Sequence, residues 1–149
     1  MNMTDEKTGP IRVILRTIQV TNNLEPAWDD EGEFRFTARV SSRDRGGVLV
    51  ETRLPAGDGT YSVSDHPARN RLYLNHVLFE GELDEHLEVE IIGDEIDLLS
   101  ADDRLGRYHR EWNGSPSSWI GYYGPSDEGA SDPERMENWN VILEIEKAN

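Results

Sequence analysis

Short segments in which every second residue is apolar are the feature that most constrains how this chain folds. The segments 33–40 (EFRFTARV) and 139–145 (WNVILEI) follow this pattern most clearly. Successive side chains of a β-strand point to opposite faces of its sheet, so the pattern predicts strands with one buried face. We expect further strands at 11–20, 48–54, 72–83, 87–91 and 105–112.

Two of these regions carry local irregularities. The alternation of segment 11–20 slips near Arg16, which predicts a β-bulge there. Segment 83–91 has leucine or isoleucine at every fourth position, as a helix does, but the apolar residues of 87–91 also alternate with glutamates. Helix and strand are both open for this segment, and the alternation favours the strand.

The number of short strands and the length of 149 residues together indicate one all-β domain. We predict an antiparallel eight-stranded Greek-key β-sandwich. Residues 1–10 are expected to form a flexible N-terminal lead and residues 11–149 the domain. The stretch 113–138 is rich in Gly, Ser and Pro, which predicts that these residues form a loop inserted in the domain.

Charge excludes several kinds of partner. The chain has 30 acidic and 15 basic residues, a net charge of −15 and no cysteine. Such a chain repels nucleic acid and anionic membranes unless a cation intervenes, although an acidic excess is also typical of salt-adapted proteomes. No signal peptide and no 18-residue apolar run occur, so the expected location is cytoplasmic by default.

The acidic residues gather in two places beside predicted strands. One group is 29–31 (DDE), and the other comprises 94–97 (DEID) with 102–103 (DD). Carboxylate oxygens at short spacing suit Ca²⁺, which takes six to eight oxygen ligands. The alternative is that these groups are solvated loop tips without a cation.

The second acidic group sits in a longer motif. Segment 95–106 (EIDLLSADDRLG) follows the strand pattern LEVEII of residues 87–92 and resembles the third calcium-binding loop of the C2-domain family, the modules of synaptotagmins and protein kinase C. In that family the strand ends in Asp-x-Asp, and a Leu-Gly-like pair opens the next strand. The resemblance implies metal ligands at Glu95, Asp97, Ser100 and Asp103, with Asp94 as an additional ligand because Glu95 stands where the family has Asp.

The first acidic group matches the family less well. Asp29 and Asp30 stand near the family's second ligand of the first loop, and Glu25 fits as a further ligand if Glu31 is its partner. The resemblance extends over residues 11–145. It implies a non-enzymatic module that binds Ca²⁺ weakly and engages a membrane phospholipid, only when Ca²⁺-bound, or a protein partner. The alternative is a calcium-independent structural or protein-interaction subunit.

Other residue types point to no further chemistry. The histidines at 66, 76, 86 and 109 show no zinc-site spacing, so we expect them on the surface or in loops. No nucleophile motif or phosphate loop occurs, and we expect no enzyme activity. Trp119, Tyr122 and Tyr123 admit two interpretations, since they either contact a partner from an exposed loop or fold over a sheet as core.

Overall fold

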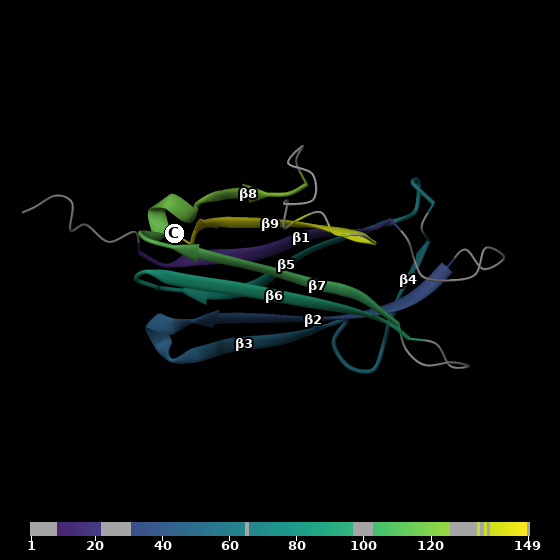
Figure 1. Cartoon of the computed structure of the whole chain (residues 1–149), viewed down its shortest axis with the longest axis horizontal. Helices are drawn as coiled ribbons and strands as arrows, with labels where there is room; N and C mark the ends of the chain where they lie inside the picture. The colour runs from purple at the N-terminus through teal and green to yellow at the C-terminus, as the bar shows by residue number, and fades with distance from the viewer. Residues whose placement is uncertain are drawn as a thin grey trace, which may run out of the picture.

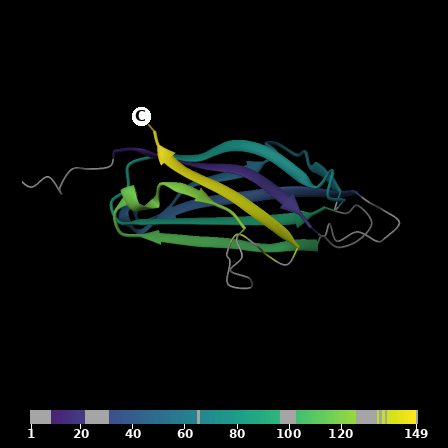
Figure 2. The ribbon, with the colours of Figure 1, turned by 90° about the horizontal axis from the view of Figure 1, so that it is seen from above.

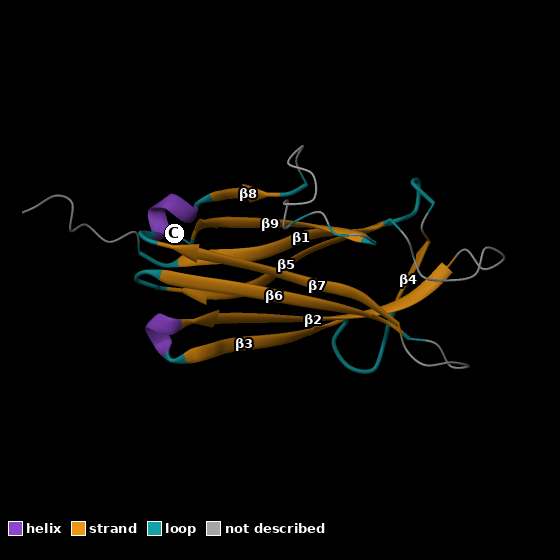
Figure 3. Cartoon of the chain, viewed as in Figure 1, coloured by secondary structure: helices purple, strands orange, loops and turns teal. Residues whose placement is uncertain are grey.

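Two antiparallel sheets pack face to face and contain the described strands (Figures 1 and 3). The computed structural model describes residues 9–21, 31–64, 66–96, 103–125, 134, 136 and 138–148, and for residues 31, 103 and 104 it describes the backbone alone. Two short 3-10 helices, η2 (Arg43–Arg45) and η3 (Pro116–Trp119), join strands. The strands are β1 (Ile11–Val20), β2 (Glu31–Ser42), β3 (Gly47–Leu54), β4 (Tyr61–Ser64), β5 (Arg71–Gly81), β6 (His86–Glu95), β7 (Asp103–Asn113), β8 (Gly121–Tyr123) and β9 (Trp139–Lys147).

The strand order confirms the predicted β-sandwich. The first sheet has the order β5-β1-β9-β8, and the second has the order β3-β2-β6-β7, with β4 pairing with β2. The chain therefore passes from one sheet to the other four times, between β1 and β2, β4 and β5, β5 and β6, and β7 and β8. The described residues form nine strands rather than eight. β4 is the unpredicted strand in the second sheet, and its four residues are too few to show a period.

The core lies between the two sheets, which Figure 2 shows from above. The alternating residues of β2 and β9 all face inward, and Phe34, Phe36, Trp139 and Leu143 are each fully buried. The Phe36 and Trp139 rings stack across the two sheets with centroids 5.8 Å apart. The alternation in the sequence thus corresponds to a shared core in which each sheet covers the other.

The two predicted irregularities have clear outcomes. The register of β1 shifts between Leu15 and Thr17 against both of its neighbours, which confirms the bulge at Arg16. The Arg16 side chain lies outside the core and donates to the Glu144 carboxylate. β6 begins at His86 and includes the alternating residues 87–91 of the segment that could also be a helix. It pairs with β2 and β7, so the strand prediction is confirmed for these residues.

The predicted inserted loop is partly wrong. Pro116–Trp119 forms η3, and Gly121–Tyr123 forms β8, which pairs with Leu143–Ile145 of β9. These segments belong to the sandwich because β8 completes the first sheet. The sequence did not predict β8 because three residues are too few to show the alternation of a strand.

Candidate functional site

The strand ends that flank both acidic segments lie at one end of the sandwich. β1 ends and β2 begins there, and β6 ends and β7 begins at the same end (Figure 1). In the second sheet Glu95 of β6 lies beside Phe34 of β2 on one side and beside Asp103 of β7 on the other. The Ile96 N–H donates to the Glu33 carbonyl at 2.7 Å. The topology therefore brings the two predicted calcium loops to one end of the molecule.

Among the predicted ligands, Glu95 and Asp94 are described with their side chains. Glu95 is 1% exposed and points between the sheets, whereas Asp94 is half-buried on the outer face. Consecutive strand residues face opposite ways, so these two carboxylates cannot replace one another by a shift of one residue. Asp103 is described by its backbone as the first residue of β7. Glu25, Asp29, Asp30, Asp97 and Ser100 lie outside the described residues.

The aromatic residues after β7 divide between core and surface. Trp119 is 1% exposed and its indole N–H donates to the Asn113 carbonyl, so of its two interpretations this residue fits the one in which it is core. The Tyr123 hydroxyl donates to the Trp119 carbonyl at 2.5 Å, and the guanidinium of Arg110 lies 4.5 Å from the Tyr123 ring. Tyr122 is 68% exposed and can contact a partner.

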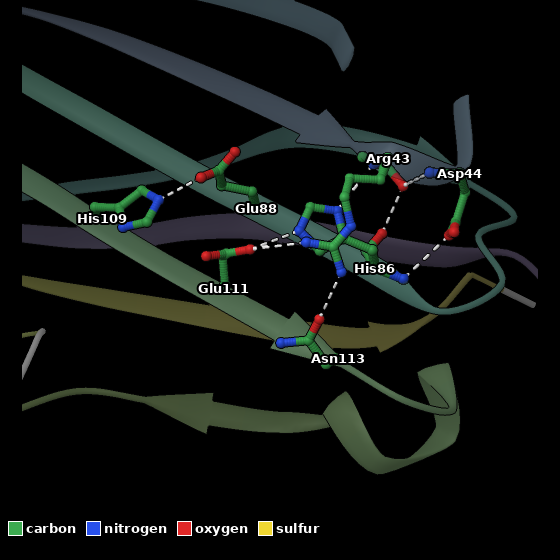
Figure 4. A network of polar contacts seen from close by, with 8 residues as sticks. Arg43, Asp44, His86, Glu88, His109, Glu111 and Asn113 are labelled. Atoms are coloured by element: carbon green, nitrogen blue, oxygen red, sulfur yellow. Dashed lines mark hydrogen bonds and ion pairs between the residues drawn. The ribbon is translucent and has the colours of Figure 1, made fainter. Parts of the chain in front are cut away.

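The opposite end of the sandwich carries a network of polar contacts that begins at Asp44 in η2 (Figure 4). Asp44 Oδ2 accepts the backbone N–H groups of Asp84, Glu85 and His86 at 2.9, 2.9 and 3.1 Å. Burial raises the pKa of Asp44, but the three N–H donors together with Ser42 outweigh it, so the pKa lies below its usual value. The carboxylate thereby fixes the turn between β5 and β6 against η2.

His86 continues this network toward β7. Its side chain is 4% exposed, so the expectation that every histidine lies on the surface or in a loop is wrong for this residue. Its Nδ1 accepts the Arg43 N–H at 2.9 Å, which leaves the ring proton on Nε2, and Nε2 lies 2.8 Å from Glu111 Oε2. This hydrogen bond from His86 is the main cause that lowers the pKa of Glu111.

A row of diagonal pairs runs from His86 along the outer face of β6 and β7. His86 contacts Glu111, His109 contacts Glu88, and Arg107 contacts Glu90. In each pair the two residues are offset from the directly opposite register positions by two residues. The sequence predicted no zinc site, yet Glu88, His109 and Glu111 form a group that can hold a metal ion. Spacing along the chain does not reveal this group because two strands contribute to it.

A hollow of about 310 Å³ lies on the outer face of the first sheet. The side-chain amide of Asn140 donates to Gln19 at 3.2 Å, and Gln19 donates to Asn70 at 3.4 Å. The three amides thus bond to one another in a row, and Arg71 is the charged residue among those that line the hollow. The lining residues are Thr17, Gln19, Arg71, Pro125, Asn140 and Ile142.

Comparison with known proteins gives a match of fold but none of sequence. No protein-family model matches the chain, and no curated protein matches it either. Among solved structures, the chain is similar to a C2 domain of plant extended synaptotagmin 1, with a TM-score of 0.50 and 6% identity over 94% of each chain. At this identity the likeness shows the fold alone. The protein is therefore a C2-like β-sandwich.

Within the part of the chain that the structure describes, the helices are the short 3-10 segments η2 and η3. None of the helices found there is both long enough and apolar enough to cross a bilayer.

Proposed function

We propose that this protein is a non-enzymatic C2-like module that binds Ca²⁺ through its acidic loops and engages a membrane phospholipid or a protein partner in a calcium-dependent way. The observation that supports this most is the register at Glu95, which lies between Phe34 and Asp103. Both acidic segments leave the sandwich at this one end, so their carboxylates can converge on a shared cation. The C2-like fold is the second support.

The donor set fits calcium in its chemistry. Every proposed ligand offers an oxygen atom, which is what Ca²⁺ prefers, and the mixed carboxylate and hydroxyl set leaves room for further ligands. Bound Ca²⁺ would supply positive charge at this end, where a phosphate or a partner carboxylate can complete the coordination. The proposed ligands are Asp29, Asp30, Glu95, Asp97, Ser100 and Asp103, with Asp94 and Glu25 as additional ones.

A thermal titration with CaCl₂ tests the calcium claim. A ligand at 100 times its dissociation constant stabilises the native state by about 2.7 kcal/mol, so millimolar Ca²⁺ should raise the melting temperature. The double variant Asp97→Asn, Asp103→Asn should lose this shift. The matched control Asp84→Asn, Glu85→Gln removes the same charge at the opposite end and should keep it. An absent shift in the wild-type protein up to 10 mM Ca²⁺, on the order of ten times the weakest module affinities, would reject calcium binding.

Co-sedimentation then tests the partner. Vesicles of phosphatidylserine and phosphatidylcholine should bind the wild-type protein in Ca²⁺ and release it in EDTA. Binding that is unchanged by EDTA contradicts calcium dependence. A Ca²⁺-dependent thermal shift without vesicle binding points to a protein partner.

A second function, a calcium-independent interaction subunit, is favoured by the first sheet. Tyr73 and Tyr122 are 71% and 68% exposed, and aromatic side chains of this kind are enriched at protein interfaces. This function predicts no Ca²⁺ shift at all. The double variant would then match or exceed the wild-type stability, because removing two carboxylates from one acidic segment of the sequence reduces the repulsion between like charges.

A further inference from the structure

We propose that Glu88, His109 and Glu111 form a second metal site, on the outer face of β6 and β7, that takes a transition-metal ion of the zinc class. Each residue offers one ligand atom, and the three atoms lie within 4.8 Å of one another. The site is separate from the acidic loops. Glu88 lies seven residues before Glu95 on β6, which at about 3.3 Å per residue is roughly 23 Å away.

The strand register explains why these side chains meet. Glu88 lies directly opposite Glu111, and His109 is two residues from Glu111 on the same face of β7. Two like charges directly opposite in a sheet are destabilising. A divalent cation between the two carboxylates would remove this repulsion, and the imidazole of His109 already reaches Glu88.

The side chain of Glu111 is held in place before any metal binds. His86 donates its Nε2 proton to Glu111 Oε2 at 2.8 Å, and the Arg43 backbone N–H fixes that tautomer through Nδ1. Hydrogen bonds to a ligating carboxylate orient it and are typical of metal sites. Because one carboxylate oxygen of Glu111 is engaged by His86, the other remains for a metal.

The donor chemistry selects the zinc class over calcium. Zn²⁺ takes one imidazole nitrogen and carboxylate oxygens at about 2.0–2.2 Å, which puts tetrahedral ligand atoms about 3.4 Å apart. The side chains of Glu88 and His109 are 34% and 31% exposed, so they can close by the required ångström or so. Ca²⁺ needs six to eight oxygens, which these three residues do not provide.

Neighbouring charges set the expected affinity. The Arg43 guanidinium lies 3.6 Å from Glu111 Oε2 and competes with a cation. Arg107 pairs with Glu90, which keeps that carboxylate from adding to the site. With three protein ligands and a nearby guanidinium, we expect micromolar binding with water in the fourth position.

Calorimetric titration of the tag-free protein with ZnCl₂, in buffer without Ca²⁺, tests this site. We expect one Zn²⁺ per chain at micromolar affinity, and a His109→Gln variant that binds at least tenfold more weakly. The control His76→Gln removes an exposed histidine from β5 in the other sheet and should leave the affinity unchanged. The circular dichroism spectrum and urea midpoint of each variant establish that it is folded.

Three outcomes would overturn the site: no Zn²⁺ binding up to about 1 mM, equal binding by wild type and His109→Gln, or an equal loss in His76→Gln. The Asp97→Asn, Asp103→Asn variant should keep its Zn²⁺ affinity. Because that variant tests the calcium loops, the two proposals can fail independently of one another. Saturating Ca²⁺ should not displace Zn²⁺ from the wild-type protein, and displacement would show that the ions share one site.

Discussion

Asp44→Ala is the substitution with the most specific expected effect on this fold. The carboxylate accepts the backbone N–H groups of Asp84 and Glu85 in the turn before β6 and that of His86, the first residue of β6. No other described side chain bonds to the Asp84 and Glu85 N–H groups. Alanine keeps the backbone of η2 but removes all three acceptor contacts. The β5–β6 turn would then lose its attachment to η2.

The structure sets the size of the effect. Hydrogen bonds to a charged group contribute about 1.5–3 kcal/mol each when buried. Two of the three contacts are exposed, so water replaces much of what is lost, and we expect a total of about 2 kcal/mol. For a domain of this size the melting temperature should fall by about 4–8 °C.

The pH dependence follows from the lowered pKa of Asp44. A carboxylate with a depressed native pKa stabilises the fold above its unfolded pKa of about 3.9, and the contribution is lost as the pH falls through the native pKa. The difference in unfolding free energy between wild type and Asp44→Ala should therefore be largest near neutral pH and shrink below about pH 4.

Urea denaturation at pH 7 and pH 3 measures this difference. The matched control is Asp84→Ala, which removes the same charge from an exposed side chain and leaves the Asp84 N–H in place. This control is needed because any lost carboxylate relieves repulsion in a chain of net charge −15. If both variants agree within about 0.5 kcal/mol, or if the difference grows in acid, the reasoning is refuted.

Two further predictions concern the second sheet. In Gly93→Ala the new Cβ would lie 2.9 Å from Leu105 Cδ1 and 2.9 Å from Phe36 Cε1, so overpacking should cost about 1–3 kcal/mol in a urea titration, and an unchanged midpoint would contradict this geometry. The carboxyl of Glu111 should titrate below the ordinary glutamate pKa of about 4.3 in a carbon-detected NMR experiment, chiefly because His86 donates to it. Its stabilising contribution is then present above pH 4.3 and lost on further acidification, and a pKa above 4.3 would exclude the hydrogen bond.

The long strands could be predicted from sequence, and the short ones could not. β2 and β9 alternate over eight or more residues, so a two-residue period is statistically visible in them. β4 and β8 have four and three residues, and their pairing depends on neighbours that are far away in the chain. Tertiary pairing, rather than local propensity, makes these two segments strands.

The same distinction separates the two candidate metal sites. Segment 95–106 is contiguous, so its ligand spacing can be compared with that of a known loop. Glu88, His109 and Glu111 meet because β6 and β7 pair in one particular register, and a slip of one residue would turn one strand's contribution to the opposite face. The spacing of residues along the chain does not reveal the register in which two strands pair. For this reason the histidine spacing alone predicted no metal site.

The net charge bears on the proposed membrane contact less than composition suggests. Arginines on both sheets pair with glutamates, as Arg12 does with Glu80 and Glu146 and Arg39 with Glu51 and Glu90, so much of the sheet charge is balanced locally. β6 has ten residues, which spans about 33 Å, whereas the Debye length is about 8 Å at physiological salt. Charges at the Asp44 end are therefore about four screening lengths from the acidic loops. Two Ca²⁺ ions would change the formal net charge only from −15 to −11, but the potential that an anionic surface meets depends on the loops themselves. The proposed contact is thus decided by whether cations reverse the charge of that one end, and the remaining acidity of the chain acts on it only weakly.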